Sequence, residues 1–214
     1  MTPAIPTDLK VINLGLPKSG TTTLGEALKR AGFKVADWKI RPHQTENKLI
    51  RRCFVGKLMY QAYFECGDPL AMMGEFNAFT EIDIIREGLN LWPQTDWGLL
   101  SAIQKHHPGA KFILTHRDAQ KLSDSMQRWS NLGRHRLPVN AIPGLPEGYG
   151  ATHQERIRWI RSHNSFCRKV FENADNFLEY DVEDKDAKDK ISAFLGVELP
   201  WWGIANANPK QGAK

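Results

Sequence analysis

The stretch Val11-Ile-Asn-Leu-Gly-Leu-Pro-Lys-Ser-Gly-Thr-Thr-Thr-Leu24 determines the predicted fold and the first candidate site. Its first four residues form a short apolar run that ends at Gly15 and indicates a buried strand. Helical spacing then runs from Thr22 to Ala31, so Gly15-Leu-Pro-Lys-Ser-Gly-Thr-Thr22 is predicted to connect the strand to a helix. In such a loop, backbone N–H groups and the helix N-terminus converge on an anion. Lys18 adds a positive charge, so the loop is expected to hold a phosphate or a similar group.

The position of the lysine distinguishes this loop from that of the nucleotide triphosphatases. Their loop, G-x-x-x-x-G-K-[ST], has a lysine directly after the second glycine, followed by a hydroxyl residue that binds Mg²⁺. Here Thr21 follows Gly20, and Lys18 lies two residues before that glycine. The order argues against a kinase or a GTPase. A plain strand-to-helix turn is the other interpretation, and the hydroxyl groups of Ser19 and of the three threonines after Gly20 argue against it.

Strand-like and helical patterns alternate along the rest of the chain. Strands are predicted at 33–38, 78–83, 111–116 and 176–181, and helices at 47–64, 95–106, 118–129, 152–173 and 185–195. This alternation predicts a three-layer α/β/α fold with a mostly parallel central sheet and with ligands outside the carboxyl ends of the strands. With 214 residues, 41% of them hydrophobic, and no visible repeat or linker, residues 1–214 are predicted to form a single domain. The Gly- and Pro-rich stretch 131–150 has no periodicity and is predicted to be a lid loop, with a disordered surface loop as the alternative.

A second candidate anion site follows the predicted strand 111–116. Arg117 ends that strand, and Ser125 comes eight residues later in the next predicted helix, so both side chains can face one ligand. An arginine fork and a serine hydroxyl could hold a second phosphate at some distance from the first loop. Taken alone, the arginine could equally form a surface ion pair with Asp118 or Asp124. Arg117 and Ser125 indicate a phosphate site only in combination with the loop 15–22.

These motifs together resemble those of PAPS-dependent sulfotransferases, which use 3′-phosphoadenylyl sulfate as donor. The segment 15–24 resembles their 5′-phosphosulfate loop, and Thr115-His-Arg-Asp118 with Ser125 resembles their 3′-phosphate site. The similarity extends to three C-terminal segments, 177–182, 194–197 and the tail from Trp201 to Asn208. The resemblance implies a P-loop NTPase-like fold and sulfuryl transfer from PAPS to an acceptor hydroxyl or amine. It also implies that the donor is bound by Pro17, Lys18, Ser19, Gly20, Thr21, Thr22, Thr23, Arg117 and Ser125.

In-line sulfuryl transfer needs a base for the acceptor proton and a cation beside the leaving oxygen of the nucleotide. Lys18 is predicted to be that cation. A sulfuryl group in transit carries less charge than a phosphoryl group, so a lysine and helix N–H groups can serve it without metal. Glu81 and Asp83 lie two residues apart near the end of a predicted strand and therefore share one face. Asp83 is favoured as the base and Glu81 is the alternative; capping of the next turn or pairing with Arg86 is the non-catalytic interpretation.

Composition limits the partners and the compartment. Lys and Arg total 29 against 24 Asp and Glu, and this net charge of +5 is scattered along the chain, which suits an anionic ligand better than nucleic acid. No apolar run reaches the roughly 20 residues of a membrane span. The three cysteines match no metal-ligand spacing and are expected to be buried thiols in a reducing cytoplasm. The leading hypothesis is a cytoplasmic, metal-independent sulfotransferase with a small-molecule or glycan acceptor, and a P-loop small-molecule kinase or a non-catalytic nucleotide-binding protein is the alternative.

Overall fold

The apolar run that starts at Val11 forms the central strand of a parallel sheet. In the computed structural model, which describes residues 5–86 and 88–205, the sheet has the order β2-β3-β1-β6-β7, and all neighbouring strands are parallel. The strands are β1 (Val11–Asn13), β2 (Val35–Ala36), β3 (Ala78–Phe79), β6 (Lys111–His116) and β7 (Phe177–Asp181). Because the strand order reverses at β1, a crevice is expected at the carboxyl ends of β3, β1 and β6.

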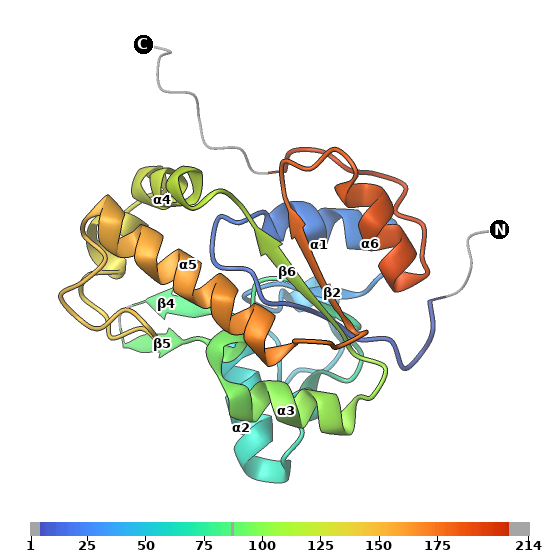
Figure 1. The fold of residues 1–214 in the computed structure, drawn as a ribbon. Helices are drawn as coiled ribbons and strands as arrows, with labels where there is room; N and C mark the ends of the chain where they lie inside the picture. The colour runs from blue at the N-terminus through green and yellow to red at the C-terminus, as the bar shows by residue number, and fades with distance from the viewer. Residues whose placement is uncertain (1–4, 87, 206–214) are drawn as a thin grey trace.

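Helices cover both faces of this sheet (Figure 1). Those over the sheet are α1 (Thr21–Arg30), α2 (Val55–Cys66), α3 (Trp97–His106), α5 (His153–Val170) and α6 (Ala187–Leu195), whereas α4 (Ala119–Arg128) packs beside the sheet against α5. Ile12 and Phe112 pack toward α2, α3 and α5, whereas Val11 and Ile113 pack toward α1 and α6. Successive side chains of a strand point to opposite faces, so each apolar strand supplies both cores. The predicted three-layer α/β/α fold with a parallel sheet is confirmed.

The predicted loop 131–150 packs beside the sheet against α4 and α5. Four of its leucine and isoleucine side chains are buried: Leu132, Leu137, Ile142 and Leu145. Arg156 of α5 is itself buried and donates hydrogen bonds to the carbonyl oxygens of Gly133, Gly150 and Ala151. Both ends of the segment are thereby fastened to α5. The segment is therefore packed structure, and its action as a lid stays a prediction.

The prediction of a helix over 47–64 was wrong in its first part, because α2 begins only at Val55. Residues 48–52 form turns instead. The Asn47 side chain accepts a hydrogen bond from the Leu49 N–H, which is a turn contact, and Arg52 has a left-handed φ of 65°. Leu49, which lies in this part of the predicted helix, is 80% exposed.

The predicted strand 78–83 is also shorter than expected, since its last four residues lie outside β3. The chain then forms an unpredicted antiparallel hairpin from β4 (Ile84–Arg86) and β5 (Leu89–Leu91). Leaving the sheet early lets residues 80–83 lie across the crevice rather than within the sheet.

Other expectations have mixed outcomes. All three cysteines are free, but only Cys167 is fully buried, since Cys53 is half-buried and Cys66 is exposed. Within the described ranges, no helix is both long and apolar enough to cross a membrane. Asn208 of the predicted tail motif lies outside the described residues.

Asn13 ties together the three strands that border the crevice. Its Nδ2 donates to the carbonyl oxygen of Thr80 at 2.8 Å, and its Oδ1 accepts from the N–H groups of Gly15 at 3.1 Å and Thr115 at 3.4 Å. The side chain is 1% exposed, so water cannot replace these contacts. Asn13 therefore fixes where the chain turns from β1 into the loop.

Replacing Asn13 by alanine should lower the free energy of unfolding by about 2–4 kcal/mol, because it leaves buried backbone groups without partners. Urea unfolding followed by circular dichroism measures this change. Asn47→Ala is the matched control, since the hydrogen bond that its side chain accepts from Leu49 is at the surface, and it should cost less than about 1 kcal/mol. Equal losses in the two variants would contradict the role given to Asn13.

Candidate functional site

Gly15 brings the loop against the end of β6. A Cβ atom at this position would lie 1.9 Å from Thr115 Oγ1 and 2.5 Å from Ser19 Oγ, so only glycine fits without displacement. The Ser19 and Thr115 hydroxyl oxygens are themselves 2.9 Å apart and share a hydrogen bond. The loop is therefore fastened to β6 just before Arg117.

The backbone of the loop directs the start of α1 toward the crevice. Lys18 and Gly20 have left-handed φ angles of 72° and 106°, and α1 begins at Thr21. In the part of the chain that the structure describes, no side chain caps this helix, and its first turn has no acidic residue. The first N–H groups of a helix have no intrahelical acceptor, so with the positive end of the helix dipole they form a site for an anion.

A cavity of about 480 Å³ lies at this helix start, and we call it the loop cavity. Its lining brings together the two predicted anion sites. From the first site it contains Pro17, Lys18, Gly20, Thr21, Thr22 and Thr23, and from the second Arg117 and Ser125. The Ser19 side chain instead packs against Thr115, so Ser19 could meet a ligand in the loop only through its backbone.

Arg117 is held at the rim of the loop cavity by an acidic partner that the sequence patterns did not indicate. Its Nε and Nη2 atoms donate to Glu183 Oε1 at 3.1 and 3.0 Å, and Lys121 pairs with the same carboxylate. The expected partners are engaged elsewhere, since Asp118 caps α4 and Asp124 pairs with His153. An anion in this cavity would share Arg117 with Glu183.

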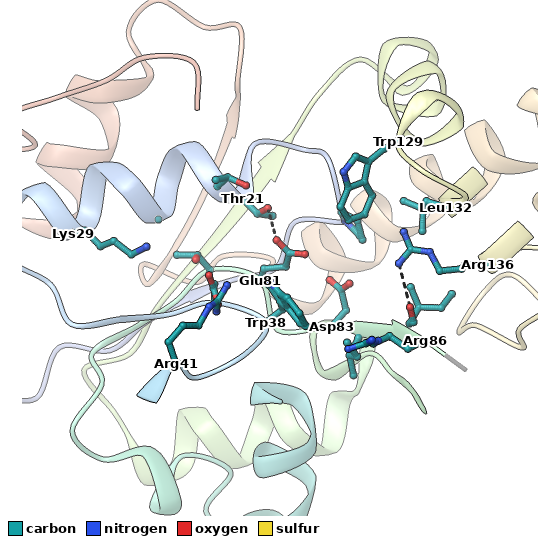
Figure 2. A pocket seen from close by; sticks show the side chains of 17 residues that line it. Thr21, Lys29, Trp38, Arg41, Glu81, Asp83, Arg86, Trp129, Leu132 and Arg136 are labelled. Carbon is teal, nitrogen blue, oxygen red and sulfur yellow. Dashed lines mark hydrogen bonds and ion pairs between the residues drawn. The ribbon is translucent and has the colours of Figure 1, made fainter. Parts of the chain in front are cut away.

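A second cavity of about 370 Å³ adjoins the first, and we call it the side cavity (Figure 2). The two cavities share five lining residues: Pro17, Thr21, Thr22, Glu81 and Trp129. Trp38 lies on the side of Arg41 and Lys29, and Arg86 and Arg136 lie beyond Asp83 on the other side. A molecule in the side cavity could therefore meet one in the loop cavity beside Glu81.

Glu81 and Asp83 form a buried acidic pair between these groups. Thr21 Oγ1 donates to Glu81 Oε2 at 3.4 Å, and Gln94 Nε2 donates to Asp83 Oδ1 at 2.8 Å. Burial raises the pKa of both carboxyl groups, and the charge of Glu81 raises the pKa of Asp83 further. Lys18 and Arg41 oppose the rise at Glu81. Two carboxylates this close do not ionise independently, so the pair retains a proton more readily than isolated acids.

Two cations lie beside the ring of Trp129 at the junction of the cavities. Lys18 Nζ lies 4.9 Å from the centre of this ring, and the guanidinium carbon of Arg136 lies 5.1 Å from it. Burial lowers the pKa of Lys18, Glu81 opposes this change and Arg117 adds to it. Both cations therefore lie beside one ring at the junction, and both interact with the charge of Glu81.

Histidines take no part in either cavity as far as the described residues show. His116, next to Arg117, turns toward β7, with Nε2 at 3.3 Å from Glu179 Oε1. Among residues 5–86 and 88–205 there is also no group of three or more His, Cys, Asp and Glu side chains placed to hold a metal ion.

Several residues of the site were not identified from the sequence. Gln94 lies in a short 3-10 helix, Pro93–Thr95, and Glu183 lies in the turn after β7; their positions depend on the tertiary fold, and no local pattern marks them. Arg136 lies in a π-helical turn, Leu132–Arg136, within a stretch that has no periodicity. For Asn13, a polar residue in an otherwise apolar strand just before a glycine was an available signal.

The chain was compared with known proteins in three ways. A family model described as a sulfotransferase domain matches residues 10–212. Among solved structures, the crystal structure of mouse sulfotransferase SULT7A1 complexed with PAP matches with 15% identity and a TM-score of 0.42, covering 91% of this chain. The chain spans 60% of the length of that mouse protein. No curated protein matches the chain by sequence.

The acidic pair predicts a pH dependence of stability. Because the pKa of Asp83 is raised in the folded state, the unfolded chain loses this proton first as pH rises above its ordinary value of about 4. The folded state then binds more protons, so the free energy of unfolding falls with rising pH until Asp83 itself ionises. In Asp83→Asn this contribution is absent. The stability of the wild type relative to Asp83→Asn should therefore decrease from acid to neutral pH.

Urea unfolding at closely spaced pH values measures this difference. Asp189→Asn is the control, because this carboxylate is exposed in the first turn of α6. Its difference from the wild type should change little above about pH 5. A difference for Asp83→Asn that stays constant with pH would show that the folded and unfolded states hold this proton equally.

Proposed function

The chain belongs to the sulfotransferase domain family, and on that basis we propose that it transfers a sulfuryl group from 3′-phosphoadenylyl sulfate (PAPS) to a hydroxyl or amine of a small acceptor. The observation that carries the proposal is the joining of two anion sites in one cavity that meets a second cavity at a buried carboxyl group. When bound, PAPS supplies the activated sulfuryl group and leaves as 3′,5′-ADP.

The loop cavity fits such a donor at both of its charged ends. Gly15 and Gly20 have no side chain to cover the loop backbone, and α1 directs its first N–H groups into the cavity. Both features suit the binding of a phosphosulfate group. Arg117 and Ser125 offer a guanidinium and a hydroxyl for a second phosphate in the same cavity. A nucleotide with phosphates at both the 3′ and 5′ positions satisfies both sites, whereas a triphosphate places all its charge at one end.

Lys18 is proposed to stabilise the charge that develops on the leaving group. It lies in the loop three residues before the start of α1, and its half-buried side chain places the ammonium group beside the Trp129 ring. Charges act more strongly in such a partly dehydrated site than in water. The positive end of α1 assists from the same side.

Glu81 is proposed to be the base, in place of the Asp83 favoured by the sequence pattern. Glu81 lines both cavities and therefore lies where donor and acceptor would meet, whereas Asp83 lines the side cavity and is bound by Gln94. Asp83 is also the more deeply buried of the two and is proposed to keep the proton that the pair retains. Glu81 is then left ionised and can accept the proton of the acceptor.

The remaining features of the proposal concern the lid and the compartment. Leu132 and Arg136 of the segment 131–150 line the side cavity, so this segment is proposed to close over a bound acceptor.

The free thiols of the three cysteines are compatible with a reducing compartment, and we propose a cytoplasmic location. We also propose that the whole chain folds as a single domain.

Binding of 3′,5′-ADP should stabilise the protein, whereas ATP with or without Mg²⁺ should not. Thermal-shift titration measures this stabilisation, and a ligand at a hundred times its dissociation constant should add about 2.7 kcal/mol to the free energy of unfolding.

Arg117→Gln should weaken 3′,5′-ADP binding by about 10- to 100-fold, because it removes a charge-assisted contact. The control Arg161→Gln changes an exposed arginine of α5 and should bind as the wild type does. A protein stabilised by ATP and Mg²⁺ but not by 3′,5′-ADP would be a kinase and not a sulfotransferase.

Glu81→Gln should reduce transfer of ³⁵S-labelled sulfate from PAPS by about 10²- to 10⁴-fold, because the base is lost. Its affinity for 3′,5′-ADP should stay within a few-fold of the wild type. Asp83→Asn should keep most of the turnover, since that residue is proposed to be already protonated. The reverse pattern, with turnover lost in Asp83→Asn and kept in Glu81→Gln, would assign the base to Asp83.

A further inference from the structure

Two arginines face the side cavity at the end away from Lys29 and Arg41. Arg86 belongs to β4 and Arg136 to the π-helical turn, and Figure 2 shows them next to each other beyond Asp83. Both also line an open groove of about 1080 Å³ that continues outward from Trp129. They therefore mark the passage between the side cavity and the groove.

These arginines differ from the other arginine of the side cavity in their partners. Arg41 forms an ion pair with Asp37. Within the described residues, neither Arg86 nor Arg136 forms an ion pair with a carboxylate. Arg136 Nη1 donates to the carbonyl oxygen of Ile85 at 3.2 Å, but its buried Nε has no hydrogen-bond partner among residues 5–86 and 88–205. A buried guanidinium donor without a partner costs free energy that a bound anion would recover.

Aromatic rings hold both guanidinium groups in place. The guanidinium carbon of Arg86 lies 5.6 Å from the ring centre of Phe54, and that of Arg136 lies over Trp129. Burial lowers the pKa of Arg136 and the charge of Arg86 lowers it further, while Asp83 and Glu81 oppose these effects. Two like charges are thus fixed near one another. An anion between them would relieve their repulsion and could accept from both forks.

Negative and positive side chains lie at different places along the side cavity. The carboxyl group proposed as the base lies where the cavity meets the loop cavity, and the arginine pair lies at the far side of Asp83. Trp38, Trp129 and Leu132 supply apolar walls, and about 370 Å³ is the size of a small-molecule site. The arginines would repel the ammonium group of an amine acceptor.

We propose that the acceptor is a small hydroxylated acid, whose hydroxyl group reaches Glu81 while its carboxylate or phosphate is bound by Arg86 and Arg136. This inference rests on the proposed function, because it identifies the side cavity as the acceptor site. The anion sets the orientation of the acceptor, and any further part of the molecule follows the outer groove past Phe54 and Leu89.

Matched pairs of acids and neutral esters test this inference. The probes are 4-hydroxyphenylpropionate and 12-hydroxydodecanoate, each with its methyl ester, and 6-hydroxyhexyl phosphate with 1,6-hexanediol. Isothermal titration, with and without 3′,5′-ADP, should show at least one acid binding about 10-fold or more tightly than its neutral partner. The carboxylate and phosphate arms show which anion is preferred.

Arg86→Gln and Arg136→Gln should each remove most of this preference and leave the affinity for 3′,5′-ADP unchanged. Arg134→Gln is the matched control, because Arg134 is an exposed arginine of the same π-helical turn, and it should keep the preference. Equal binding of acids and neutral partners in every pair would overturn the inference, as would a preference that survives in both test variants. Arginine-dependent binding of acids without any sulfate transfer from PAPS would instead overturn the proposed function and leave the anion site standing.

Discussion

The close approach of Gly15 to Thr115 is the constraint on which the site depends. The chain crosses from β1 into the loop so near to β6 that a single Cβ atom would collide with the Thr115 hydroxyl group. This contact, with the Ser19 to Thr115 hydrogen bond, fixes the loop to the strand that delivers Arg117 two residues later. The distance between the two anion sites is then set by the sheet, where Asn13 is in register with Ile113. Two short motifs, one hundred residues apart in sequence, thus form one rigid cavity.

A second consequence of the fold is the position of Glu81. Because β3 ends at Phe79, the residues after it are free to cross the crevice and place one carboxyl group at the junction of two cavities. Burial and like charge make the acidic pair hold a proton, while Lys18 and Arg41 favour the ionised form of Glu81. Lys18 lines the loop cavity and Arg136 lines the side cavity, and both cations lie beside the ring of Trp129. In the proposed function, donor chemistry would take place in the loop cavity and acceptor recognition in the side cavity.

Local patterns in the sequence were sufficient for the parts of the site that are themselves local. The loop before α1 and the step from β6 to Arg117 follow from strand, turn and helix signals, since a helix start attracts anions wherever it occurs. The choice between Glu81 and Asp83 could not be made in the same way, because it depends on which cavity each side chain enters. The Glu183 partner of Arg117 comes from a turn 66 residues away, and the Gln94 partner of Asp83 comes from a short 3-10 helix beyond the hairpin. The helix predicted from residue 47 failed because local side-chain hydrogen bonds and a left-handed Arg52 stabilise turns instead.

The central claim is that one nucleotide is held by two separate anion sites, and a crystal structure of the protein with 3′,5′-ADP tests it most directly. The 5′-phosphate should lie against the first N–H groups of α1 beside Lys18, and the 3′-phosphate should lie within hydrogen-bonding distance of Arg117 and Ser125. A nucleotide bound in the opposite direction, or one whose 3′-phosphate meets neither Arg117 nor Ser125, would contradict the account.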